Sequence, residues 1–243
     1  MSISGNSVVL GVFGDPVAHS LSPAMHSQFS GLTGENTVYV PFHVPPEGLG
    51  TALNALPSLG IRGVNITVPH KEAAYRRLAV HSGAAEAIGA VNTVIVEGAR
   101  LIGDNTDADG FLADLEAHFP GRPWQDGPAL VVGAGGAARA VVYALRKAGC
   151  PEILIANRNP EKAANLLDQL APTQGRTIPL VSEALAPELN RTGLLINTTT
   201  QGLHGERIEA VDCDQLPIEA AVYDLVYSPA RTPLLQDAEN RGL

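Results

Sequence analysis

The sequence predicts two α/β domains arranged around a cleft. Three observations support this fold class. Short apolar runs alternate with helical segments, many of these runs end in glycine or proline, and residues 129–156 form a complete strand, glycine turn, helix and strand. Such alternation is typical of sheets with helices on both faces. We expect residues 1–107 to form the first domain, with a mixed or parallel sheet, and residues 108–243 to form the second.

Composition excludes several classes of function. The formal net charge of −9 argues against general nucleic-acid binding, which needs a basic surface. No apolar stretch is long enough to span a membrane, and the N-terminus lacks a signal-peptide pattern. Cys150 and Cys213 lie far apart, so we expect two buried thiols and no disulfide. We therefore expect a cytoplasmic protein, monomeric or homodimeric, with no nucleic-acid or membrane partner.

The first domain reads as an ordered series of short elements. Strands are expected at residues 8–14, 36–44, 63–68 and 92–96, the last continuing through a hairpin into residues 101–103, and helices at residues 22–29, 46–59, 84–88 and 107–119. Thr106 or Asp107 is a candidate cap for the last of these helices.

A lysine stands at an unusual strand-to-helix junction. Residues 65–71 read Asn-Ile-Thr-Val-Pro-His-Lys, and Pro69 suits the first position of a helix. Lys71 then falls in the first turn, where the helix dipole disfavours a cation by a few tenths of a kcal/mol up to about 1. That field suits a lysine that transfers a proton. The alternative is an ordinary solvated lysine followed by Glu72.

Two serines precede a predicted helix. Ser22 followed by Pro23 reads as an N-cap with proline in the first turn. Hydroxyl groups beside the free N–H groups of a helix start can bind a small anion. Capping alone would explain Ser22 but not Ser20.

The second domain opens with a dinucleotide-binding pattern. The strand at 129–132 leads into G-x-G-x-x-A at Gly133, Gly135 and Ala138, followed by a helix to about Lys147. The glycines let the backbone approach a pyrophosphate, which sits on the helix N-terminus, so a Rossmann-like domain is predicted.

The end of the next strand indicates which dinucleotide binds. An NAD enzyme usually places an acid there for the ribose 2′-OH, but this sequence has Arg158, with Lys162 four residues on. Because an arginine fork can bind a 2′-phosphate, NADP is favoured over NAD.

The rest of the domain repeats the alternation. Strands are expected at residues 152–156, 178–181, 194–197 and 221–227, helices at 161–170 and 232–240, a loop at 198–203 and a linker or domain edge at 121–127.

With these motifs in place, the sequence resembles the shikimate dehydrogenase family over nearly its whole length. The resemblance rests on motifs that occur in order, at residues 14–23, 65–72, 89–93, 103–107, 133–137, 157–158 and 223–227. It implies an NADP-dependent oxidoreductase acting on a CH–OH group. The implied reaction is the reversible NADPH-dependent reduction of 3-dehydroshikimate to shikimate, in aromatic amino acid biosynthesis.

The resemblance also implies roles for individual residues. Lys71 and Asp107 match the catalytic pair. Substrate contacts are implied for Ser20, Ser22, Thr67, Asn92, Asp107 and Tyr227, with the two serines on the carboxylate. Cofactor contacts are implied for Gly133, Ala134, Gly135, Gly136, Ala137, Asn157, Arg158, Asn159, Lys162 and Leu225. No metal site is implied.

Two departures from the family pattern leave alternatives open. The family continues with a helix that returns to the substrate domain and supplies a glutamine, whereas this sequence stops at Leu243. The loop at 199–202 also differs from the usual Ala-Thr-Ser/Pro-x-Gly. The alternatives are a quinate/shikimate dehydrogenase of relaxed specificity and a truncated, non-catalytic paralogue that binds a cofactor or a carboxylate.

Overall fold

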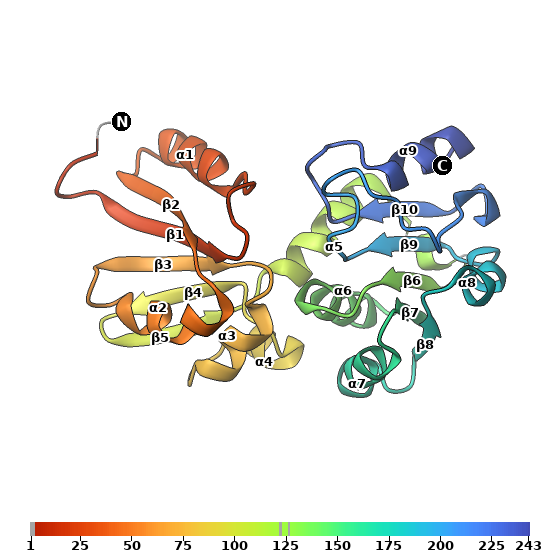
Figure 1. The fold of residues 1–243 in the computed structure, drawn as a ribbon, viewed down its shortest axis with the longest axis horizontal. Coiled ribbons are helices and arrows are strands. Elements are labelled where there is room, and N and C mark those ends of the chain that lie inside the picture. The colour runs from red at the N-terminus through yellow and green to blue at the C-terminus, as the bar shows by residue number, and fades with distance from the viewer. Residues whose placement is uncertain (1–2, 122, 126) are drawn as a thin grey trace. The chain divides into compact units, whose positions relative to one another are not determined.

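The structure is a computed structural model that describes residues 3–121, 123–125 and 127–243. The chain divides into two compact units, Met1–Thr106 and Asp107–Leu243 (Figure 1). The predicted linker at 121–127 lies inside the second unit, and its Trp124 is only 2% exposed. Trp124 is therefore packed, and the boundary lies instead between Thr106 and Asp107. Arg122 and Asp126 lie outside the described residues.

The first unit contains a mixed five-stranded sheet. Its strands are β1 (Val8–Gly14), β2 (Thr37–His43), β3 (Ile61–Ile66), β4 (Thr93–Glu97) and β5 (Arg100–Asp104), in the order β2-β1-β3-β4-β5. β1 pairs in parallel with β2 and β3, whereas β3–β4 and β4–β5 are antiparallel. The predicted hairpin is confirmed as β4–β5.

Helices cover both faces of this sheet. They are α1 (Ser22–Thr33), the 3-10 turn η1 (Pro46–Gly48), α2 (Leu49–Ala55), α3 (Lys71–Arg77) and α4 (Gly83–Ile88). His26 of α1 stacks on Tyr39, whereas Phe42 packs into the hydrophobic core with residues of α2, α3 and α4. Positions 39 and 42 of a strand point to opposite faces, so α1 covers one face and α2–α4 cover the other. Figure 1 shows α1 lying along β2.

Three helix predictions for this unit are wrong in detail. Pro69 is not the first residue of a helix: His70 N donates to Thr67 O at 2.9 Å, which closes a turn, and α3 begins only at Lys71. Ser22 is not an N-cap, because Leu21 occupies that position and Ser22 is already helical. The predicted helix at 46–59 is broken into η1, α2 and a turn ending at Gly60.

The second unit is built on a parallel sheet. Its strands are β6 (Ala129–Val132), β7 (Ile153–Asn157), β8 (Gly175–Pro179), β9 (Leu194–Asn197) and β10 (Ala221–Asp224), in the order β10-β9-β6-β7-β8. All four ladders are parallel. The strand order reverses direction between β6 and β9, and ligands of open α/β sheets bind at such a switch point.

Helices bury both faces of this sheet as well. They are α5 (Asp107–His118), η2 (Pro123–Gln125), α6 (Gly136–Lys147), α7 (Pro160–Leu170), α8 (Ser182–Leu189), η3 (Cys213–Gln215) and α9 (Pro233–Arg241). Leu130 and Leu154 pack with α8, η3 and α9, while α6 and α7 contact β6 and β7. Tyr223 of β10 donates to Asp114 of α5 at 2.5 Å, which anchors that helix to the end of the sheet.

Three predictions for the second unit need correction. The strand predicted at 178–181 is β8, which lies earlier because its ladder with β7 starts at Gly175. Helix α8 follows it and was not predicted, since Pro187 interrupts its pattern. The strand predicted at 221–227 ends at Asp224, whose carboxylate accepts the N–H of Val226 at 2.9 Å and starts a turn.

The prediction of two buried thiols is confirmed. Cys150 and Cys213 are free and buried, and burial raises the pKa of each thiol to about 11. No helix in the described part of the chain has the length and apolar character to span a membrane.

An ion-pair network joins the amino ends of three strands of the second unit. Arg191 bonds both carboxylate oxygens of Glu152, at 2.6 and 2.7 Å, and also reaches Glu188 at 2.7 Å. Arg176 of β8 bonds Glu188 at 2.6 Å. Bidentate geometry and shared partners make such a network stronger than an isolated surface pair.

We expect Arg191→Ala to lower the free energy of unfolding of the second unit and to change how this free energy depends on pH. The hydrogen bonds of Arg191 lower the pKa of Glu152 from its ordinary value of 4.5. A carboxylate with a lowered folded-state pKa stabilises the fold above its unfolded pKa, and that contribution disappears as the pH falls through the folded-state pKa. Urea unfolding followed by circular dichroism should show a loss of up to about 1 kcal/mol at neutral pH.

The same measurement repeated down to acid pH checks the mechanism. Below about pH 4.5 the variant and the wild type should converge, because the stabilising charge is being lost in the wild type. Arg241→Ala, which removes an exposed arginine outside the network, is the control. An equal loss of unfolding free energy for Arg191→Ala at every pH would show that the charge of Glu152 is not the source of the stabilisation.

Candidate substrate and cofactor sites

Polar residues of the first unit gather at the carboxyl ends of β1 and β3. Gly14 ends β1 and packs against Thr67, since a Cβ on Gly14 would lie 2.5 Å from the Thr67 methyl group. Thr67 N donates to Phe13 O at 2.9 Å, which ties the two strand ends together. The predicted substrate and catalytic residues of this unit lie next to strand ends: Ser20 and Ser22 after β1, Thr67 and the catalytic Lys71 after β3, and Asn92 directly before β4.

The backbone around Lys71 is held from several directions. His70 is 1% exposed, and its Nε2 lies 2.6 Å from the carbonyl oxygen of Val44, beyond the end of β2. The carbonyl of Lys71 itself accepts the N–H of Val91 at 3.0 Å. Lys71 lies in the first turn of α3, as predicted, but as the first residue of the helix, on a backbone that is anchored to two neighbouring segments.

The start of α1 has no side-chain N-cap, because Leu21 occupies that position. Ser20 Oγ accepts the N–H of Ser22 at 3.3 Å and so satisfies one of the N–H groups of the first turn. Both side chains are partly exposed beside the helix start, as an anion site requires.

Asn92 is a buried amide, 8% exposed, that organises the last part of the unit. Its Oδ1 accepts the hydroxyl of Thr93 at 2.9 Å and the N–H of Thr106 at 3.1 Å, while its Nδ2 donates to Thr106 Oγ1 at 3.0 Å. Asp107 follows Thr106 but opens α5 of the second unit, so its predicted pairing with Lys71 stays a prediction.

The glycine turn of the second unit has the form that a pyrophosphate needs. Gly133 has φ +111°, and a Cβ there would lie 2.6 Å from Thr198 Oγ1, so only glycine fits. Gly135 is the N-cap of the 12-residue helix α6, makes no side-chain cap, and has nothing within 4 Å of the position a Cβ would take. The uncapped helix start faces open space, which fits a bound phosphate; Ala134, Gly136 and Ala137 complete the turn.

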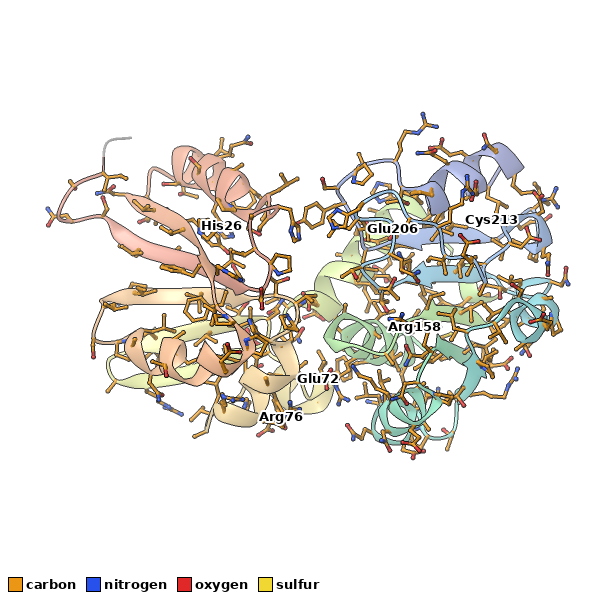
Figure 2. The ribbon with its side chains drawn as sticks, in the orientation of Figure 1. His26, Glu72, Arg76, Arg158, Glu206 and Cys213 are labelled. Atoms are coloured by element: carbon orange, nitrogen blue, oxygen red, sulfur yellow. The ribbon has the colours of Figure 1, made fainter. Side chains whose placement is uncertain are left out.

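The turn after β7 presents Arg158. Asn157 Nδ2 donates to Asn159 O at 2.8 Å, and Asn159 Oδ1 caps α7 by accepting the N–H of Lys162 at 3.1 Å. Both asparagines therefore shape the turn. Arg158, labelled in Figure 2, is exposed between them at the carboxyl end of the strand.

A second buried amide shapes the loops after β9 and β10. Asn197 is fully buried; its Oδ1 accepts the N–H and hydroxyl of Thr199, and its Nδ2 donates to Gln201 O at 3.0 Å and to Asp224 Oδ1 at 2.9 Å. Burial raises the pKa of Asp224, and Thr232 donates to its other oxygen at 2.7 Å.

The residues that follow this network include two of the predicted contacts. Leu225 N donates to Asn197 O at 3.0 Å, so the backbone of Leu225 is fixed beside β9. Tyr227, two residues on, is 56% exposed.

Sequence reasoning missed several of these groups. Tyr39, Asn65 and Thr93 join the predicted residue Asn92 in one hydrogen-bonded chain. The available signal for Asn65 and Thr93 was their place in the motifs at 65–72 and 89–93, whereas Tyr39 stands in none of the motifs.

No set of three or more His, Cys, Asp or Glu side chains in the described residues could hold a metal ion.

Comparison with known proteins identifies the family. A model described as the shikimate dehydrogenase substrate binding domain matches residues 12–94, and one described as shikimate / quinate 5-dehydrogenase matches residues 116–203. The chain is 45% identical to the shikimate dehydrogenase (NADP(+)) of Rhodospirillum rubrum over 243 residues, 99% of this chain and 86% of that relative.

Solved structures agree with the sequence matches. Shikimate 5-dehydrogenase from Thermus thermophilus, in complex with NADP(H) and shikimate, is 42% identical with a TM-score of 0.80, over 97% of this chain and 85% of that one. Quinate dehydrogenase from Corynebacterium glutamicum, in complex with NAD, is 30% identical with a TM-score of 0.86, over 97% and 86%. The chain therefore belongs to the shikimate dehydrogenase family.

Proposed function

We propose that this protein is an NADP-dependent shikimate dehydrogenase that catalyses the reversible reduction of 3-dehydroshikimate to shikimate. The observation that carries the proposal is that one chain combines an uncapped glycine turn at α6 with an anchored lysine among hydroxyl and amide groups. The NADP(+)-dependent relative at 45% identity supports it. The direct test is NADP+ reduction by shikimate, followed by NADPH absorbance.

The substrate is proposed to bind through hydroxyl donors at its carboxylate and through donors and acceptors at its ring hydroxyls. Ser20 and Ser22 provide hydroxyl donors for its carboxylate, beside the start of α1. Thr67, Asn92 and Asp107 provide donors and acceptors for its ring hydroxyls. Tyr227 is proposed to lie near the substrate.

Lys71 is proposed as the proton donor and acceptor. Reduction of a ketone builds negative charge on its oxygen, so a positioned donor lowers the barrier. NADPH, when bound, supplies the hydride to the carbonyl carbon. The Lys71 ammonium gives its proton to the forming alkoxide, and in the reverse direction the neutral amine takes a proton from the alcohol. Asp107 as its partner would favour the ammonium form.

The cofactor is proposed to bind at the carboxyl edge of the second unit. The turn at Gly133–Ala137 and the start of α6 would hold the pyrophosphate. Asn157 and Asn159 hold the turn from which Arg158, with Lys162 nearby, would reach a 2′-phosphate. Leu225 would lie beside the nicotinamide.

Lys71→Ala should abolish most of the turnover without preventing cofactor binding. Loss of a general acid and base lowers kcat by roughly 100- to 10,000-fold. Steady-state kinetics with shikimate and NADP+ measures this loss, and calorimetry measures NADP+ affinity, which should be unchanged.

Lys147→Ala is the matched control for that experiment. Lys147 is an exposed lysine at the far end of α6, so its removal should leave kcat near the wild-type value. A Lys71→Ala variant with wild-type turnover would show that Lys71 does not transfer the proton.

Arg158→Ala should weaken NADPH binding far more than NADH binding. Charge-assisted hydrogen bonds to a phosphate are each worth about 1.5–3 kcal/mol, equivalent to roughly 10- to 100-fold in KM. Arg146→Ala, in the last turn of α6, controls for the lost positive charge. Equal losses for both cofactors would rule out a 2′-phosphate contact.

A quinate/shikimate dehydrogenase of relaxed specificity is the second candidate. Likeness to a quinate dehydrogenase crystallised with NAD, at a TM-score of 0.86, favours it. Arg158 opposes it, because an acid usually holds the ribose in NAD enzymes. Comparing shikimate with quinate, and NADP+ with NAD+, in one assay separates the two functions.

The cytoplasmic location and the monomeric or homodimeric state of the protein stay predictions from the sequence.

A further inference from the structure

A continuous chain of hydrogen bonds crosses one face of the first unit. It connects β2 with the segment after β5 through side chains on β2, β3 and β4. Its members, in order, are Tyr39, Asn65, Thr93, Asn92 and Thr106. It reaches Asn92, which is proposed to hold a ring hydroxyl of the substrate.

The orientation of the Asn65 amide determines what Tyr39 must do. Asn65 Nδ2 lies 3.4 Å from the carbonyl oxygen of Asn92 and 3.1 Å from Thr93 Oγ1. A carbonyl oxygen only accepts, so the NH₂ group has to face it and Oδ1 has to face the other way. Oδ1 lies 2.6 Å from the Tyr39 hydroxyl, which therefore donates its proton to Asn65.

The Asn92 amide is oriented by the same reasoning. The N–H of Thr106 only donates, so Oδ1 of Asn92 faces it at 3.1 Å. The Thr93 hydroxyl accepts from Asn65 and gives its own proton to Asn92 Oδ1 at 2.9 Å. All the bonds from Tyr39 to Asn92 thus run in one direction, with no exchange of donor and acceptor possible at either amide.

Tyr39 is itself held firmly. Its ring stacks on the His26 imidazole of α1, with centroids 4.0 Å apart and planes 8° from parallel (Figure 2 labels His26). Burial raises the pKa of Tyr39 to about 12, so its hydroxyl keeps the proton that Asn65 requires over the working pH range. Since that proton is committed to Asn65, Tyr39 acts through its partners and not as a donor to substrate.

We propose that Tyr39 is a positioning residue that, through Asn65 and Thr93, fixes the Asn92 amide, so that the ring-hydroxyl end of the substrate site keeps one geometry. This inference rests on the proposed function. It assigns Tyr39 and Thr93 to substrate affinity, not to hydride or proton transfer.

Tyr39→Phe is the first test. It keeps the ring that stacks on His26 and removes only the hydroxyl. We expect the KM for shikimate to rise about 3- to 10-fold, the value for one neutral hydrogen bond, with kcat and the KM for NADP+ nearly unchanged. Tyr75→Phe, on α3 of the same unit, is the control and should leave all three values unchanged.

Two variants of Thr93 test the next hydroxyl in this series of hydrogen bonds. Thr93→Val removes the hydroxyl and should raise the KM for shikimate to a similar extent, whereas Thr93→Ser keeps it and should restore the wild-type value. Tyr39→Phe combined with Thr93→Val should raise KM by less than the product of the single effects, because both break one network. A fully multiplicative result, or a wild-type KM in Tyr39→Phe, would overturn the proposal.

A measurement without turnover separates this inference from the proposed function. Side-chain amide signals of Asn65 and Asn92 in a ¹H–¹⁵N spectrum should shift in Tyr39→Phe and not in Tyr75→Phe. An inactive wild-type protein whose Asn92 signal still responds to Tyr39→Phe would refute the proposed function and keep the hydrogen-bonded chain. Unchanged Asn92 signals would refute the chain even in an active enzyme.

Discussion

Parallel strand pairing is the constraint on which both candidate sites depend. Parallel strands end at the same edge of a sheet, so the loops that follow them gather there. In the first unit this brings Gly14 against Thr67, and Lys71 starts the helix that follows. In the second unit it brings the turn at Gly133 against Thr198, at the point where the strand order reverses. The chemistry of each unit is thus concentrated at one edge, while helices bury the faces.

Buried asparagines hold those loops in place. Asn92 and Asn197 each accept two donors on Oδ1 and donate from Nδ2 to neighbouring segments. An amide has one accepting end and one donating end, so it fixes both the position and the direction of the groups around it. Leaving such a buried group unsatisfied costs about 1–3 kcal/mol, which favours one loop conformation over its alternatives. Loops built in this way can present side chains to a ligand with little reorganisation.

Much of the architecture could be predicted because its signals are local. The order of strands and helices, the hairpin of β4 and β5, and the unit from β6 to β7 all follow from apolar runs and glycine positions. The errors arose where tertiary contacts overrode local rules. A turn closed by Thr67 delayed the start of α3, the ladder with β7 moved β8, and Asp224 ended β10. Helix α8 was missed because of an internal proline.

The sequence by itself determined the family resemblance, the dinucleotide turn and the identity of the proposed reactive residues, because each depends on residue type and spacing along the chain. Only the tertiary structure decided which polar groups donate hydrogen bonds to which acceptors. Ser20 accepts the N–H of Ser22 at the start of α1, and Tyr39 donates to Asn65 across β1. Such pairings join residues far apart in sequence, and strand order and register, which only the folded chain establishes, bring them together.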